Sequence, residues 1–326
     1  MTNALLGNAT VRARLWRAAD EGRLHHCCIF EGPEGVGKAT TAFQLAMYMN
    51  CTGESRPCGA CGSCKLLLAG SHPDFVRVEP DPDMATRTIT IDQARGVIAD
   101  LRLQRHSARR RVVLIDPVDT LGEAAANALL KTFEEPPPAT QFILVTARAG
   151  ALLQTVRSRS QRVRFGPVPR AELAAWLVER GLDPTLADDA DGSPGLALRL
   201  AEGEGAARAE VEAALLAVLG QPLGAVFSFA EANGKKEEGV SAADKVIDAL
   251  EAILRDVVRL GAGRAPRRDH PAVPRLVAAL YPEGVARLDQ QCALARDRLR
   301  FNVGGRVVLE ALFTAINLEL SAARRT

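Results

Sequence analysis

The chain has 326 residues, of which 47% are hydrophobic and 25% charged, and its formal net charge is +2. This composition indicates a globular protein of about two to three domains and excludes one that coats nucleic acid by bulk positive charge. No apolar run approaches the roughly 20 residues of a membrane span, and the first residues lack the features of a secretory signal. We therefore expect a protein of the reducing cytoplasm without membrane contact.

The first half of the chain alternates between strand-like and helix-like segments. Short apolar runs suited to buried strands are followed by segments in which apolar residues recur at helical spacing. The expected strands are Cys27–Phe30, Phe75–Val78, Val112–Ile115, Phe142–Val145 and Val163–Phe165. The expected helices are Ala39–Met49, Ile91–Leu103, Glu123–Glu134 and Ala149–Arg157. This alternation predicts a parallel sheet covered by helices on both faces.

Strand signals end after residue 167, and the remainder is rich in alanine and leucine at helical spacing. Ala171–Arg180 and Ser193–Ala201 predict short helices, which a polar turn through Asp188, Asp189 and Asp191 would join. Glycines within 203–205 predict a hinge. We therefore predict an α/β domain at 1–167, a small helical domain at 168–204 and a larger helical domain at 205–326.

The segment from Gly32 to Lys38 reads Gly-Pro-Glu-Gly-Val-Gly-Lys, follows an expected strand and opens an expected helix. This is the context of a phosphate-binding loop. Gly32, Gly35 and Gly37 would let backbone N–H groups turn toward phosphate oxygens. Lys38 would reach the outer phosphates of a nucleotide such as ATP. The alternative is a glycine-rich turn that binds no ligand.

The positions that would hold Mg²⁺ and activate water depart from what ATP hydrolysis requires. Ala39 stands where the Mg²⁺-binding hydroxyl belongs, and Thr40 is one position late, which on a helix turns its side chain by about 100°. Asp116 ends a buried strand and suits a Mg²⁺-associated carboxylate, but Pro117 follows where a catalytic glutamate is expected. Thr146 ends the next strand, where its hydroxyl would reach the γ-phosphate. We expect a site that can hold ATP but binds Mg²⁺ and hydrolyses ATP poorly.

A group of cysteines separates the first expected helix from the second expected strand, with C-x6-C-x2-C-x2-C spacing. Its members are Cys51, Cys58, Cys61 and Cys64. This spacing can place four thiolates around one tetrahedral Zn²⁺, and four thiolates leave no open position for catalysis. Disulfides and unrelated free thiols are the alternatives, of which the first is disfavoured in a reducing compartment. Cys27, Cys28 and Cys292 are expected to be small buried apolar residues.

Other polar patterns have simpler interpretations. Asp119 is expected to cap the helix that follows it. The arginine-rich segment at 105–111 is expected to be a solvated edge, with contact to DNA or a partner as the alternative. Glu134 and Glu135 are adjacent on a helix, so their side chains diverge by about 100° and do not form an acid/base pair.

Together these features resemble the clamp-loader subunits of bacterial DNA polymerase III, the gamma/tau/delta-prime group of the AAA+ superfamily. The resemblance covers most of the chain. Its segments are Leu24–His26, Gly32–Lys38, the four cysteines, His72–Phe75, Ala125–Pro137, Ser158–Ser160, Gly192–Gly195, and Asn302 with Arg306 and Glu310. It implies an AAA+ domain with a zinc insertion, a helical lid domain and an all-α collar that holds the loader together.

The resemblance also implies roles for single residues. Arg159 would be an arginine finger that enters a neighbouring subunit's ATP site, and Ser160 replaces the family's cysteine beside it. Gly195 stands where the ATP-hydrolysing members carry a second-sensor arginine. With Ala39 and Pro117, this departure implies the delta-prime type, a non-catalytic subunit of the DNA polymerase holoenzyme. Its partners would be the gamma/tau motor subunits and the delta subunit, and, through the complex, the sliding clamp and primer–template DNA.

Two other functions remain open from the sequence. One is a gamma/tau-type motor, an ATPase in its own right, for which Lys38 would be essential. The other is a zinc-dependent nucleic-acid-binding module that uses the cysteine group with Arg56 and Lys65. Turnover of ATP by the purified chain would distinguish the first, and salt-dependent DNA affinity the second.

Overall fold

The computed structural model describes residues 5–81, 88–104, 108–219, 221–234, 242–266, 270–300 and 303–323. The chain folds into two compact units, Met1–Ala201 and Glu202–Thr326. Asn302, one of the residues in the resemblance, lies outside the described residues. The finer division into three domains stays a prediction.

The first unit contains a parallel sheet with strand order β2-β3-β4-β1-β5. Its strands are β1 (Cys27–Glu31), β2 (Phe75–Val78), β3 (Arg111–Ile115), β4 (Thr140–Thr146) and β5 (Gln161–Arg164). All five expected strands are therefore confirmed. Because the strands run in one direction, their amino ends lie together at one end of the sheet, the amino end. Their carboxyl ends lie together at the other, the carboxyl end.

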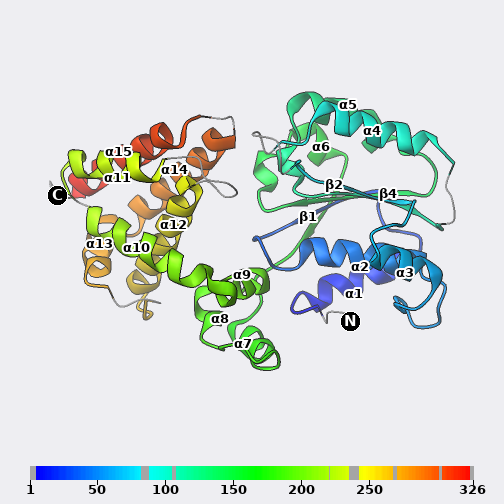
Figure 1. Cartoon of the computed structure of the whole chain (residues 1–326), viewed down its shortest axis with the longest axis horizontal. Coiled ribbons are helices and arrows are strands. Elements are labelled where there is room, and N and C mark those ends of the chain that lie inside the picture. Colours follow the sequence, from blue (N-terminus) through cyan, green and yellow to red (C-terminus); the bar gives the residue numbers. More distant parts are fainter. Residues whose placement is uncertain are drawn as a thin grey trace. The chain divides into compact units, whose positions relative to one another are not determined.

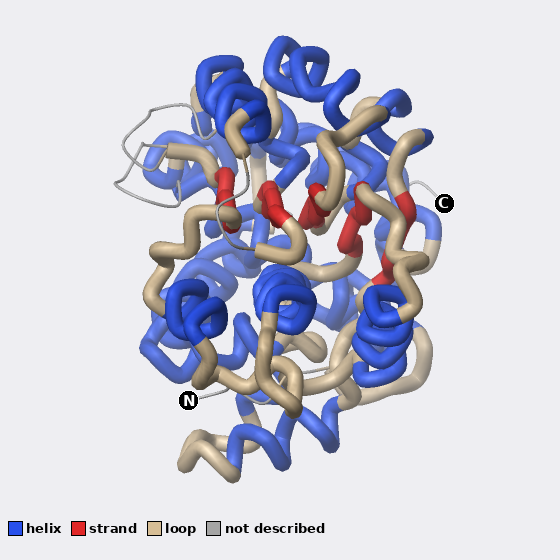
Figure 2. The backbone as a smooth tube through the Cα atoms, turned by 90° about the vertical axis from the view of Figure 1, so that its right-hand side faces the viewer, coloured by secondary structure: helices blue, strands red, loops and turns tan. Residues whose placement is uncertain are grey.

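Helices cover both faces of the sheet (Figures 1 and 2). One face carries α1 (Ala9–Asp20), α2 (Lys38–Asn50) and α3 (Gly62–Leu68), and the other α4 (Ile91–Arg102), α5 (Glu123–Glu134) and α6 (Gln154–Ser158). Alternate residues of one strand supply the two cores. Cys28 and Phe30 pack in the cluster with α1 and α2, whereas Cys27 and Ile29 pack in the cluster with α4 and α5. Neither α1 nor α3 was expected from the sequence.

Two predictions about the helices that cover the sheet are wrong. The expected helix Ala149–Arg157 is a 3-10 turn, η2 (Ala149–Ala151), followed by α6, because Leu152 is extended and buries its side chain. Asp119 does not cap α5. It lies in a 3-10 turn, η1 (Val118–Thr120), and Gly122 is the residue before α5.

The last part of the first unit is helical and has its own apolar cluster. It contains α7 (Arg170–Val178), α8 (Leu186–Asp189) and α9 (Pro194–Arg199), and ends within a π turn, η3 (Leu200–Glu204). The expected polar turn is confirmed at Asp191, which lies in a turn with φ 50°. It is wrong for Asp188 and Asp189, which lie in α8, whose Ala187 is buried in that cluster. Ser193 begins α9 by accepting a hydrogen bond from the Leu196 backbone N–H at 3.0 Å. Gly203 has non-helical torsion angles (φ 110°), so the chain bends at the expected hinge.

The second unit is helical throughout its described part. It contains α10 (Gly205–Val218), α11 (Leu223–Asn233), α12 (Ala242–Gly261), α13 (Ala272–Leu280), α14 (Glu283–Arg300) and α15 (Gly305–Ala323). The strongly amphipathic α12 supplies much of the core. Arg296 of α14 pairs with Asp248 and Glu251 of α12, and Arg306 of α15 with Glu231 of α11. No helix in the described parts of the chain combines the length and apolarity that a membrane crossing requires.

Candidate functional site

The phosphate loop leaves β1 at the carboxyl end of the sheet and leads into α2, as expected. Gly32, Gly35 and Gly37 have φ values of 147°, 72° and 91°, in the range that favours glycine. The Lys38 side chain is buried and bends back onto the loop. Its Nζ donates hydrogen bonds to the backbone oxygens of Gly32 (2.8 Å) and Pro33 (2.5 Å). Burial is the main reason that the pKa of Lys38 is lowered. The lysine thus satisfies the loop's own carbonyl groups.

The start of α9 packs directly on the phosphate loop. The Gly195 backbone N–H donates to the Gly35 oxygen at 2.9 Å. A Cβ at Gly195 would lie 2.9 Å from the Gly35 Cα, and a Cβ at Gly35 only 2.2 Å from the Ser193 Oγ. An arginine could not replace Gly195 without moving α9 away from the loop. Tertiary packing alone reveals this contact, which no sequence pattern indicated.

Thr146 and Asp116 both lie at the carboxyl end of the sheet. The Thr146 hydroxyl donates to Asp119 Oδ1 at 2.8 Å and accepts the Arg148 backbone N–H at 2.8 Å. Arg148 also pairs with Asp119, at 3.2 Å. Burial is the main reason that the pKa of Asp116 is raised. Thr40 is exposed on α2. The hydroxyl expected at the γ-phosphate therefore has its only hydrogen engaged within the chain.

Arg159 lies at the opposite end of the sheet. It follows α6 and comes two residues before Gln161, which pairs with Cys28 near the start of β1. The phosphate loop begins after Glu31, at the end of β1. Residues 27 and 31 are separated by about 13 Å along a strand that rises ~3.3 Å per residue. The Arg159 side chain is 36% exposed and pairs with Glu134.

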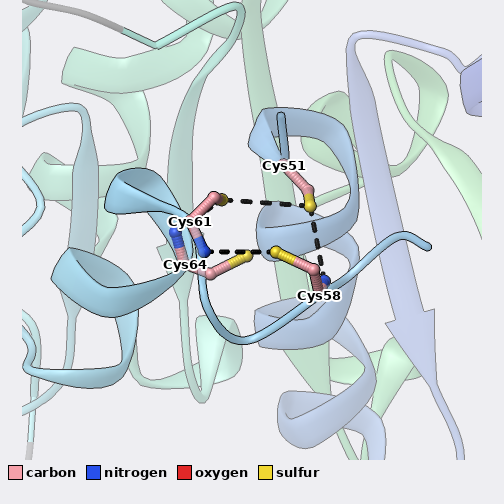
Figure 3. Close-up of side chains that lie close together, drawn as sticks. All are labelled: Cys51, Cys58, Cys61 and Cys64. Atoms are coloured by element: carbon pink, nitrogen blue, oxygen red, sulfur yellow. Dashed lines mark hydrogen bonds between the residues drawn. The ribbon is translucent and has the colours of Figure 1, made fainter. Parts of the chain in front are cut away.

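The four predicted zinc ligands come together between α2 and α3 (Figure 3). Their sulfur atoms all lie within 4.8 Å of one another, which approaches the ~3.8 Å that tetrahedral Zn–S bonds of ~2.3 Å would give. Backbone N–H groups, that of Thr52 first, lower the pKa of Cys61 to about 5. The donor set and its spacing therefore fit a structural Zn²⁺. The other three cysteines, Cys27, Cys28 and Cys292, are fully buried, as expected.

A buried polar network joins α3 to the sheet, and sequence reasoning missed it. His72 Nε2 lies 3.2 Å from Ser63 Oγ of α3, and His72 Nδ1 accepts the Asp74 backbone N–H at 3.1 Å. Asp74 pairs with Arg111 at 3.2 Å, with side-chain exposures of 0% and 5%. Arg111 also donates to the Asp100 backbone oxygen at the end of α4. The expectation of a solvated edge is therefore wrong for Arg111, which is the first residue of β3 and is compensated by Asp74. The described rest of that segment is more accessible, since Arg109 is exposed.

These observations define an α/β protein of the phosphate-loop class, followed by helical segments, as the sequence predicted for an AAA+ chain. The family model "DNA polymerase III, delta subunit" matches residues 7–169, half of the chain. The chain belongs to this family.

The chain is also similar to individual curated proteins and to a solved structure. The chain is 34% identical over 193 residues to DNA polymerase III subunit delta' of Escherichia coli K12, covering 56% of each chain. It is 33% identical over 251 residues to subunit tau of the same organism, covering 71% of this chain and 38% of tau. A gamma-subunit-related protein of Thermotoga maritima has a TM-score of 0.42 at 15% identity, covering 95% of this chain and 99% of that one. The chain spans about half the length of the curated delta' relatives that it matches.

Proposed function

We propose that this chain is the delta-prime subunit of a bacterial DNA polymerase III clamp loader and supplies Arg159 in trans to a neighbouring ATP site. In this proposal it works in the cytoplasm at the replisome, beside the gamma/tau motor subunits and the delta subunit. ATP binding by the motor favours an assembly that opens the sliding clamp, and hydrolysis releases the clamp on primed DNA. The family match and the delta' relatives support this assignment.

The observation that carries the proposal is the position of Arg159. It lies at the amino end of the sheet, whereas the chain's own phosphate loop lies at the carboxyl end. An arginine finger must contact the transferring phosphoryl group, so Arg159 cannot serve its own loop in this structure. Its partial exposure is compatible with contact to a second molecule. A finger placed in this way acts only on a neighbour.

The carboxyl end supports the second half of the proposal, that the chain does not hydrolyse ATP itself. Ala39 and Pro117 supply neither the metal-binding hydroxyl nor the catalytic carboxylate. Lys38 and Thr146 make their hydrogen bonds within the chain, and Gly195 packs on the loop where a sensor arginine would need room. Nucleotide binding would require Lys38 to exchange its carbonyl partners for phosphate oxygens.

Zinc completes the proposal as a structural ion held by Cys51, Cys58, Cys61 and Cys64. A closed four-thiolate site would fix the segment between α2 and α3 and would take no part in chemistry. Metal analysis of the purified chain should give one zinc per chain, and Cys61→Ser should remove it and lower the unfolding temperature. Full-length chain with no bound zinc and an unchanged unfolding temperature would refute this part.

The central experiment compares loaders reconstituted with wild-type chain, Arg159→Ala and Arg180→Ala. Arg180 is a matched control because it is exposed and its side-chain contacts with described residues are to Trp176, in the last part of the preceding helix, α7. We expect Arg159→Ala to lower the DNA-stimulated ATPase rate of the complex by at least ~100-fold at the site it completes, as fingers do elsewhere. Clamp loading should fall with it, and Arg180→Ala should be unchanged. Equal rates for all three complexes would refute the proposal.

The longer alignment with tau favours one alternative, a gamma/tau-type motor. Such a motor would turn over ATP as the purified chain, and Lys38→Ala would abolish the turnover. The nucleic-acid-binding alternative gains less support, because Arg56 already pairs with Asp20 at 2.8 Å and lies over the Tyr48 ring. Lys65 remains exposed on α3.

A further inference from the structure

The guanidinium group of Arg159 is held on one side by the chain itself. Its Nε donates to Glu134 Oε1, and its Nη1 donates to the Thr155 backbone oxygen (3.1 Å) and to Ser158 Oγ (3.4 Å). Among the residues that the structure describes, no acceptor within hydrogen-bond distance contacts Nη2. Glu134 comes from the end of α5, a different helix from the one that Arg159 follows. The carboxylate therefore fixes the guanidinium plane while part of its donor fork stays available to an external acceptor.

Glu134 is the last residue of α5, and the end of this helix is held by packing and by a hydrogen bond. The neighbouring Phe133 is fully buried and meets Phe142 of β4 edge to face, with ring centroids 5.1 Å apart. The Phe133 backbone oxygen, in the last turn of α5, accepts a hydrogen bond from His26 Nε2 at 2.9 Å. That bond satisfies a carbonyl that the end of the helix would otherwise leave open. The end of α5 is thus anchored to the segment that precedes β1.

The backbone of Arg159 is anchored from the other side. Its N–H donates to the Val156 oxygen at 3.3 Å, and the Ser160 hydroxyl donates to the same oxygen at 2.8 Å. Ser160 Oγ also lies 3.2 Å from Cys27 Sγ, at the start of β1. Three segments far apart in the sequence, 26–27, 133–134 and 158–160, therefore meet around one arginine.

We infer that Glu134 is a positioning residue for Arg159, an inference that rests on the proposed function. Both side chains of the pair are partly exposed, 36% and 41%, so the pair contributes little to stability. Its effect is on orientation. A free arginine side chain would lose conformational freedom on meeting a phosphate, whereas one already fixed through Nε loses less. The contact should therefore raise the catalytic rate at the neighbouring site without changing how tightly ATP binds there.

The test uses the reconstituted loader with Glu134→Ala, Glu134→Gln, Glu135→Ala and Arg159→Ala. Glu135 is a matched control, since it is the adjacent, exposed carboxylate, follows the end of α5 and is not among the described hydrogen-bond partners of Arg159. We expect Glu134→Ala to lower kcat of the complex about 10-fold with KM for ATP within about two-fold, a loss of orientation rather than of binding. Glu134→Gln keeps an oxygen acceptor for Nε and should stay within about three-fold of wild type, and Glu135→Ala should match wild type.

A double variant separates the two claims. If Glu134 acts through Arg159, adding Glu134→Ala to Arg159→Ala should change the rate no further. An unchanged rate for Glu134→Ala, while Arg159→Ala is impaired, would overturn the positioning role and leave the finger intact. A higher rate would also overturn it, because Glu134 would then compete with phosphate. If Arg159→Ala itself has no effect, the proposed function fails. Gel filtration of each complex checks that assembly is unchanged.

Discussion

The two ends of the sheet differ in where their polar side chains form hydrogen bonds. At the carboxyl end, Lys38, Thr146 and Asp119 bond to groups of their own unit, and α9 packs on the phosphate loop. At the amino end, Arg159 is held by Glu134 but keeps donors available, and it is partly exposed. At the carboxyl end, the polar groups are hydrogen-bonded within the chain. At the amino end, Arg159 is held in place with donors available to a second molecule.

Under the proposed function, the two ends of the sheet are the two halves of ATP sites shared between subunits, and the comparison implies that each half can change independently. A parallel sheet separates them by the length of its strands, so substitutions near the phosphate loop leave the segment around Arg159 untouched. Ala39, Pro117 and Gly195 all concern the carboxyl end. The amino end instead retains contacts between distant segments, including the buried Asp74–Arg111 pair. Substitutions at each end can therefore test this contrast separately.

The largest effect should come from the buried ion pair that organises the amino end. Asp74→Ala leaves Arg111 charged, buried and without its carboxylate, which typically costs about 3–5 kcal/mol of unfolding free energy. Urea unfolding of the purified chain measures this loss. The double variant Asp74→Leu with Arg111→Met should recover most of it, because no unpaired charge remains. A loss below about 1 kcal/mol for Asp74→Ala would show that the amino end does not depend on this pair.

Next in size is the replacement of the finger by a lysine. Arg159→Lys keeps the positive charge but loses the planar fork and the Nε–H that contacts Glu134. We expect the ATPase rate of the reconstituted complex to fall by at least ~10-fold, although less than with alanine. Single-turnover hydrolysis in the complex measures it. A full rate with lysine would mean that the positive charge alone suffices. The fixed orientation of the Arg159 guanidinium group would then not contribute to the rate.

A much smaller effect is expected at the carboxyl end. Lys38→Ala should leave the ATPase rate of the reconstituted complex within about two-fold of wild type, because the hydrogen bonds described for the Lys38 ammonium group go to the loop that carries it. The same assay as for Arg159→Lys allows a direct comparison. A ten-fold loss of the ATPase rate would contradict the difference between the two ends, since it would show that this chain's own phosphate loop works as an ATP site.

The smallest expected effect is a pH dependence of stability through His72. Burial is the main reason that the pKa of this histidine is lowered in the folded chain. The unfolded chain therefore binds a proton first as pH falls below about 6.5, and stability decreases from there down toward the folded pKa. His72→Asn keeps an acceptor for the Asp74 N–H and should reduce the difference in urea midpoint between pH 7.5 and 5.5. An identical difference in both proteins would contradict this role.

Much of the molecule could be predicted from sequence patterns. All five strands overlap the apolar runs that predicted them. The match is best for the inner strands β1, β3 and β4, because a strand buried on both faces must be largely apolar, whereas the edge strand β5 begins two residues early and is mostly polar and exposed. The phosphate loop and the four cysteines were recognisable because their chemistry requires fixed spacing within a short segment. The short turns that interrupt or precede helices could not be predicted from the spacing of apolar residues. The 3-10 turns before α5 and α6 depend on what Asp119 and Leu152 contact, and spacing does not contain that information.

Sequence alone thus determined the alternating α/β segments, the altered phosphate loop and the cysteine group, since each depends on neighbours along the chain. Only the tertiary structure decided that Gly195 packs on Gly35, that Asp74 compensates a buried Arg111, and that His26, Glu134 and Arg159 belong to one arrangement. These contacts join residues that are tens to more than a hundred positions apart. Their partners are chosen by the strand order of the sheet and by the packing of helices on it, which local patterns do not encode.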